Sequence, residues 1–209
     1  VTNAFNQWFD EASRYAFLLN TLQFDPSSLR HGTVHPLRVL DMSMRLNDIK
    51  NSTNYIYELV IHIEGFPYVI YSQGTCDFDI FFNHVFHNER YSPEFWKSHF
   101  AKRKVSTLIS TSRYETKIGT SFRSHGNLIA LVSSFDEFDV DYSAIVYISQ
   151  EELVQYFLPE GSYQPLGFAV VGEDLQTVFN NSDLNNTLIR KLIDKSRPEI
   201  ARVINDNYF

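Results

Sequence analysis

Histidines three or four residues apart are the first residues in this chain whose spacing could serve chemistry. His84 and His87 are followed by Glu89, and His31 precedes His35. Such a pair can chelate a metal if its segment is helical, because both side chains then lie on one helix face. Neither pair has a third ligand at a diagnostic spacing. Polar or half-buried histidines beside a sheet explain both pairs without a metal, and we favour that interpretation.

A second set combines acidic residues with a lysine. Asp77 and Asp79 are followed later in the chain by Glu115-Thr116-Lys117, and strand alternation would place Glu115 and Lys117 on one face. An aspartate followed by Glu-x-Lys on a later strand resembles the PD-(D/E)xK nucleases. The resemblance implies that Asp77, Asp79 and Glu115 hold Mg²⁺ and that Asp79, Glu115 and Lys117 are catalytic, with the lysine helping to activate water. An exposed cross-strand charge pair is the alternative interpretation of Glu115 and Lys117.

A nuclease would also need a surface that binds phosphate groups. The dense basic run Lys102-Arg103-Lys104 is the candidate nucleic-acid-binding surface. The same run falls near the end of a helix that we expect to begin at Ser92-Pro93, where basic side chains complement the helix dipole. The formal net charge of −7 disfavours a nucleic-acid partner without excluding it.

Two further segments resemble landmarks of the ADP-ribosyltransferases. They are a Ser-Thr-Ser strand at residues 110–112 and an apolar-Pro-x-Gly-Ser run at residues 158–162, and Arg30 would stand for the NAD-binding arginine. The position expected to hold the catalytic glutamate is Gln155. The resemblance therefore implies at most a degenerate member, and a capping box that begins at Ser149 predicts a helix where that family has a strand.

These candidate residues must be positioned by a fold that is organised around residues 55–86, the longest apolar and aromatic run. Residues 65–67 divide it into two expected strands, 55–64 and 68–72, with both alternating faces of the first largely apolar. Residues 77–86 either continue as a third strand or open a helix. We expect four aliphatic residues of this hairpin to be nearly fully buried: Val60, Ile61, Val69 and Ile70.

The remaining elements follow from hydrophobic spacing and from capping residues. The expected helices are 4–23, one from Ser92, one from Ser149, and two closing helices that begin near Ser182 and Ser196. The expected strands are 37–46, the arms 113–122 and 128–135 of a hairpin around residues 124–127, 142–148, and 166–171.

The sequence therefore predicts a single α+β domain over residues 1–209. We expect a mostly antiparallel sheet of about six or seven strands, with an N-terminal helix and two C-terminal helices. Hydrophobic residues make up 44% and charged residues 21%, which is ordinary for a globular chain and unlike a disordered one. With Cys76 as its one cysteine, the chain can form no intrachain disulfide.

Every catalytic pattern above is short, and the chain is acidic and rich in aromatic residues, with 18 Phe and 12 Tyr. Aromatic residues are enriched at the centres of protein interfaces. Our leading hypothesis is a non-enzymatic protein-interaction module with a protein partner and no cofactor. The alternative is the Mg²⁺-dependent nuclease. No run is long and uncharged enough to cross a membrane, so we expect no membrane association. The single cysteine fits a reducing compartment, and we expect a cytoplasmic location.

Overall fold

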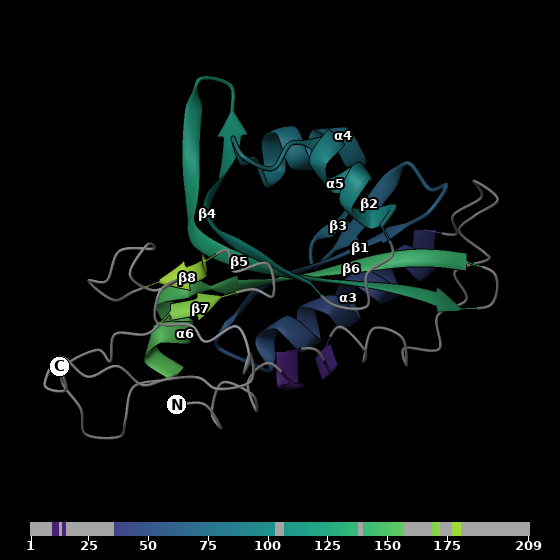
Figure 1. Cartoon of the computed structure of the whole chain (residues 1–209). Coiled ribbons are helices and arrows are strands. Elements are labelled where there is room, and N and C mark those ends of the chain that lie inside the picture. Colours follow the sequence, from purple (N-terminus) through teal and green to yellow (C-terminus); the bar gives the residue numbers. More distant parts are fainter. Residues whose placement is uncertain are drawn as a thin grey trace, which may run out of the picture.

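An antiparallel sheet of six strands forms the centre of the computed structural model (Figure 1), which describes residues 10–12, 14–15, 36–102, 107–137, 140–156, 169–171 and 177–180. The strand order is β3-β2-β1-β6-β5-β4, and every neighbouring pair is antiparallel. The strands are β1 (Ile56–Ile63), β2 (Tyr68–Tyr71), β3 (Gly74–Asp77), β4 (Thr107–Ile118), β5 (Ser121–Glu137) and β6 (Val140–Ser149). A two-stranded sheet joins β7 (Ala169–Val171) to β8 (Thr177–Asn180).

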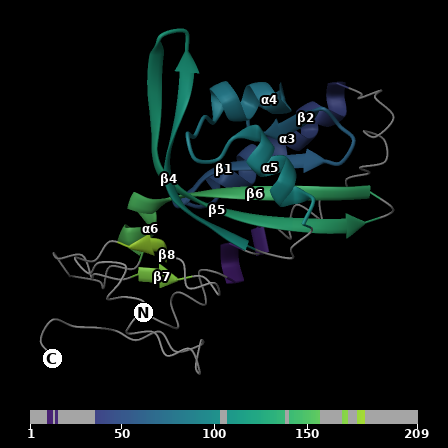
Figure 2. The same ribbon diagram turned by 45° about the horizontal axis from the view of Figure 1, so that its top comes forward.

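Helices pack on both faces of the curled six-stranded sheet (Figure 2). The helix α3 (Pro36–Asn51) buries Met42 and Leu46 against one face, which we call the outer face. The opposite, inner face is covered by α4 (Phe78–Ile80), the π-helical turn η1 (Phe81–Val85) and α5 (Pro93–Phe100). The helix α6 (Gln150–Tyr156) follows β6. The predicted α+β class with an antiparallel sheet is confirmed.

The predicted strand at residues 37–46 is wrong, because this segment lies in α3. Its more buried apolar positions are Val39, Met42, Leu46 and Ile49, which recur every three or four residues as on one helix face. The interpretation as a strand relied on an imperfect period of two that also counted Met44, which is exposed.

The central hairpin forms as predicted. Ile61 pairs with Ile70 across it, and Val60, Ile61, Val69 and Ile70 are each at most 1% exposed. Residues 77–86 open a helix: the Asp77 carboxylate accepts the backbone N–H groups of Asp79 and Ile80, each at 3.0 Å. The aspartate thus caps α4, which turns the chain from β3 onto the inner face.

The predicted hairpin at residues 113–135 exists, but its turn was misplaced. The chain reverses at residues 119–120, where Ile118 pairs with Ser121 and Gly119 has a φ of +61°. Gly126, which the sequence placed in the turn, has a φ of +83° at an irregularity inside β5. Turns and bulges both use glycine at positive φ, so the sequence pattern alone does not separate them.

Two predicted helix starts are confirmed by their caps. Ser92 Oγ accepts the N–H of Phe95 at 3.4 Å, and Ser149 Oγ accepts the N–H of Glu152 at 3.3 Å. Residues 10–12 and 14–15 are helical within the predicted helix 4–23. The rest of that helix and the two closing helices, expected near Ser182 and Ser196, lie outside the described residues.

Truncating the centre of the core should be costly. Replacing Ile61 by Ala is expected to lower the free energy of unfolding by about 2–5 kcal/mol, because it leaves a cavity between the sheet and α3. Urea denaturation of the parent and the variant measures the change. A loss below about 1 kcal/mol would mean that the site collapses around the smaller side chain or that Ile61 is not at the core's centre.

Candidate functional site

The outer half of the β4–β5 hairpin stands away from the other strands and is the most distinctive feature of the molecule (Figure 1). We call residues 113–127 the arm and residues 117–122 its tip. Two irregularities of register lie at or near the base of the arm, one between Ile109 and Ser112 and one between Tyr114 and Glu115. Bulges of this kind bend a strand and increase its twist, so they account for the departure of the arm from the sheet.

The second bulge also changes which side chains of β5 face inward. Leu128, Ala130 and Val132 belong to the core of the inner face. Tyr114 pairs with Gly126 and Glu115 pairs with Ser124, so His125 is the extra residue between these pairs. An inserted residue reverses the alternation beyond it, and His125 is thereby aimed toward the inner face.

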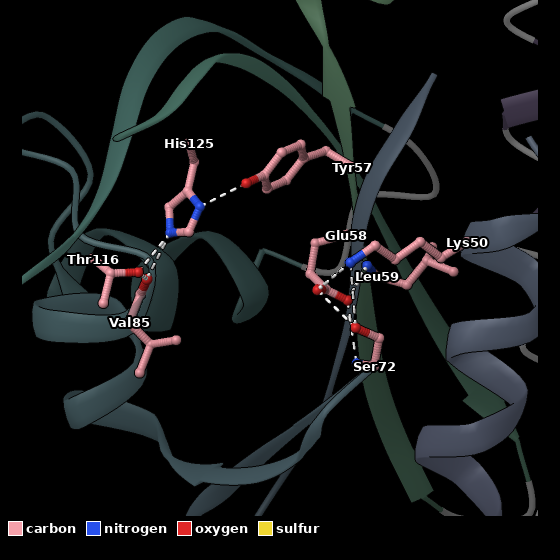
Figure 3. A network of polar contacts seen from close by, with 8 residues as sticks. All are labelled: Lys50, Tyr57, Glu58, Leu59, Ser72, Val85, Thr116 and His125. Atoms are coloured by element: carbon pink, nitrogen blue, oxygen red, sulfur yellow. Dashed lines mark hydrogen bonds and ion pairs between the residues drawn. The ribbon is translucent and has the colours of Figure 1, made fainter. Parts of the chain in front are cut away.

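The His125 ring ties three separate segments together at the base of the arm (Figure 3). Its Nδ1 lies 2.7 Å from the Tyr57 hydroxyl of β1, and its Nε2 lies 2.7 Å from Thr116 Oγ1 of β4. The same Nε2 is 3.1 Å from the carbonyl oxygen of Val85 in η1, to which the Thr116 hydroxyl also donates at 2.9 Å. The ring stacks on Phe86 with their centroids 4.6 Å apart. The contacts link β1, β4 and η1 through one side chain of β5.

The partners of His125 determine its tautomer. The carbonyl oxygen of Val85 can only accept a hydrogen bond. The His125 Nε2 that contacts it must therefore carry the ring proton and donate it. Nδ1 is then free to accept from the Tyr57 hydroxyl. Desolvation by burial lowers the pKa of His125 and raises the pKa of Tyr57, so the chain of contacts is neutral near pH 7. A neutral ring that donates at one nitrogen and accepts at the other can hold the arm in place through two hydrogen bonds.

Two further contacts brace the arm from the edge of β4. The backbones of His87 and Glu115 exchange hydrogen bonds of 2.8 and 3.0 Å. The buried Asn88 amide donates to the Arg113 carbonyl and to Ser112 Oγ, each at 2.7 Å, while its Oδ1 accepts two backbone N–H groups of the following residues. A buried amide with all these groups satisfied fixes the segment after η1 against β4.

An ion pair joins the buried Glu58 of β1, next to Tyr57, to the partly buried Lys50 of α3 (Figure 3). Glu58 is 2% exposed and its Oε2 is 3.0 Å from Lys50 Nζ. Ser72 donates its hydroxyl and its backbone N–H to the same carboxylate, at 2.8 and 3.2 Å, and the Leu59 N–H donates at 3.0 Å. The saturated carboxylate joins the end of α3 to β1 and to the end of β2.

The tip of the arm exposes two large apolar side chains. Ile118 is 63% exposed and Phe122 is 60% exposed, on either side of the turn at Gly119. Lys117 pairs with Phe122 across the hairpin, with its Nζ 6.0 Å from the ring centroid. Alternation from Thr116 places Ile118 on the inner face, whereas Phe122 and Lys117 lie on the outer face. The tip is therefore apolar on both faces.

The residues of the nuclease hypothesis have separate roles in the structure. The Asp77 carboxylate caps α4, Asp79 pairs with Lys97 at 2.6 Å, and Glu115 and Lys117 lie on the arm. Within the described segments, no three His, Cys, Asp or Glu side chains gather in a way that could hold a metal ion. Lys102 is exposed just beyond the end of α5. The metal and catalytic roles of these residues stay a prediction.

Other predicted residues fall partly beyond the description. Arg103, Lys104, Arg30, His31 and His35 lie outside the described residues. Among the rest, His84 is exposed in η1, and the pKa of half-buried His87 is lowered chiefly by desolvation. Gln155 lies in α6, the helix that the capping box predicts.

The sequence analysis missed Tyr57 and His125, which hold the arm, and Glu58, which joins α3 to β1 and β2. A signal existed for Glu58, because a lone carboxylate inside an otherwise apolar strand must find partners when it is buried. His125 gave no such signal, since Ser-His-Gly-Asn is a typical turn sequence.

Comparisons of the chain with protein-family models, with curated proteins and with solved structures find no match in any of the three. No helix among the described segments is both long and apolar enough to cross a membrane.

Proposed function

We propose that this chain is a non-enzymatic protein-interaction module whose contact surface is the tip of the arm. The observation that carries the proposal is the pair Ile118 and Phe122, each at least 60% exposed at the end of a braced hairpin. Single exposed apolar side chains are ordinary, but apolar side chains gathered at one place on the surface favour a protein contact, and Ile118 and Phe122 lie at one hairpin tip. They become buried when a partner covers them, and aromatic side chains provide much of the energy in such contacts.

The braced base supports this proposal on energetic grounds. Association is weakened by the entropy lost when mobile segments become ordered on binding. Hydrogen bonds to Val85, Tyr57 and Asn88 hold the arm before any partner arrives. A hairpin that is already ordered therefore loses less conformational entropy when a partner binds its apolar tip. The proposal needs no cofactor.

A photo-crosslinking experiment tests the proposal. The photoreactive residue p-benzoylphenylalanine would replace Phe122 in the full chain, which is then irradiated in an extract of its source cells. We expect a discrete crosslinked protein at this position. The double variant Ile118→Ser/Phe122→Ser should lose the same partner in co-precipitation, while its melting temperature stays close to that of the parent because both side chains are exposed.

Leu40 provides the matched control position. It is 56% exposed on α3, outside the arm, so that a photoreactive residue there samples a second exposed apolar surface. Crosslinking only from position 40, or no discrete product from position 122, would show that the arm is not the contact surface.

A further inference from the structure

We infer that the tip of the arm binds an extended protein segment in which acidic and apolar side chains alternate. The inference rests on the proposed function, since it names the chemistry of the partner for the same surface. Three features of the arm support it: its charges, their place beside the apolar side chains, and the edge of β4 beyond Glu115.

The arm is basic although the chain is acidic. Residues 113–127 contain the cations Arg113, Lys117 and Arg123 and the single anion Glu115, a net charge of 3 − 1 = +2. The whole chain carries −7, so the remainder carries −7 − 2 = −9. The ion pairs found among the described residues use Arg45, Lys50 and Lys97 as cations and none of the three cations of the arm. These three charges are thus available to carboxylates of a partner.

Cations and apolar side chains lie side by side on each face of the arm. Lys117 pairs with Phe122 on the outer face, and Arg123 pairs with Thr116 on the inner face, which Ile118 shares. A partner that covers either apolar side chain must therefore place its own groups next to a cation. Carboxylates at that position gain a favourable interaction that strengthens as the contact excludes water.

The edge of β4 favours an extended partner. β4 is the last strand of the sheet order, and Glu115 uses its outward backbone groups to pair with His87. Lys117 lies two residues further along, so its backbone N–H and C=O point outward in the same direction. A segment that continues the bridge begun by His87 would add a short strand at this edge and would bring every second side chain to one face.

A membrane surface is the competing partner for an apolar tip with basic flanks. The charge of −9 on the remainder of the chain opposes approach to an anionic bilayer, whereas a single acidic segment meets mainly the arm. The charges therefore favour the protein segment, and vesicle binding serves as one outcome of the test.

A displayed library of random 12-residue peptides, selected against the immobilised full chain, provides the probe. We expect enriched peptides to alternate Asp or Glu with apolar residues. The affinity of an enriched peptide is then measured by fluorescence anisotropy. The double variant Lys117→Glu/Arg123→Glu should weaken binding at least about tenfold, because two attractions become repulsions. Phe122→Ser should weaken it about 30-fold, as for a central contact residue.

Lys102→Glu is the control for charge reversal outside the arm, since it makes one such reversal, half the charge change of the double variant, at an exposed lysine beyond the end of α5. Its affinity should stay within about twofold of the parent, and binding by the parent should weaken as salt rises. The parent and the variants are also mixed with vesicles of phosphatidylserine and phosphatidylcholine. We expect no binding that depends on Phe122.

The outcomes separate this inference from the proposed function. Loss of peptide binding in Phe122→Ser, without loss in Lys117→Glu/Arg123→Glu, would support the tip as a protein-contact surface and would overturn the inference that its partner is acidic. Equal peptide affinities in the parent and in all arm variants would overturn both the acidic segment as partner and the tip of the arm as contact surface. Enrichment of basic peptides, or of none, would overturn the acidic segment, and vesicle binding that requires Phe122 would assign the tip to membranes.

Discussion

Replacing Glu58 by Ala is expected to lower the free energy of unfolding by about 3–5 kcal/mol. The substitution removes an acceptor that is 2% exposed and leaves the Lys50 ammonium and the Ser72 N–H without their shared partner. Removing one member of a buried ion pair is costly because the remaining charge stays partly desolvated. Urea denaturation near pH 7 measures the loss of stability. The Lys50 side chain is 26% exposed, so water solvates part of the charge that is left without a partner. The extent of this solvation decides where between about 3 and 5 kcal/mol the loss falls.

Two further variants make the Glu58 prediction specific. Asp41→Ala breaks the exposed ion pair with Arg45, where the measured loss should stay below about 1 kcal/mol. The double variant Lys50→Met/Glu58→Leu removes both charges and should recover much of the loss, because no unpaired charge remains. A loss below about 1 kcal/mol in Glu58→Ala itself would mean that water replaces the carboxylate at little cost.

Glu58 also shows what could be predicted from the sequence and what could not. The strand around it was predicted, because residues 55–64 are apolar on both faces and a covered strand needs that pattern. Its partners come from the end of α3 and the end of β2, eight and fourteen residues away in the chain. Only the packing of these elements on one another brings the three groups together, and local patterns carry no information on it.

The arm illustrates the same limit within one hairpin. Its strands were predicted from alternation, but the position of its turn was not, because Gly119 and Gly126 both have positive φ. Taking the second glycine as the turn put His125 in a loop and hid its contact with Tyr57. α3 was missed for a related reason, since its sequence contains apolar residues two positions apart that imitate the alternation of a strand.

Acid should destabilise the fold in the pH range in which His62 titrates, and this is the second large effect that we expect. Its ring lies against Phe78 and Phe100, with centroids 4.7 and 5.5 Å away, and its buried Nδ1 has no hydrogen-bond partner. The pKa of His62 is lowered from 6.5, the value of an unperturbed histidine, to about 4. Desolvation by burial is the largest cause; a hydrogen bond to the Tyr68 backbone raises the pKa, and the charge of Lys97 lowers it.

The sign follows from the two pKa values of His62. Between pH 6.5 and about 4 the unfolded chain binds a proton at His62 that the folded chain does not bind, so stability falls as the pH falls. The stability that the neutral, buried His62 ring contributes is fully present above pH 6.5 and is lost by about pH 4. A difference of 6.5 − 4 = 2.5 units corresponds to about 3–4 kcal/mol, at roughly 1.4 kcal/mol per unit. The pKa values of His87 and His125 are lowered as well, which adds to the loss with the same sign.

Comparison of the parent with His62→Phe isolates this contribution from the carboxylates that also titrate in acid. Phenylalanine keeps a ring between Phe78 and Phe100 and has no group to protonate. Urea denaturation at pH 7 and pH 5 should show a loss of stability that is about 2 kcal/mol smaller in His62→Phe than in the parent, since 1.5 of the 2.5 units lie above pH 5. Equal losses in the two proteins would mean that the His62 ring reaches water or a partner in the folded chain and keeps an ordinary pKa.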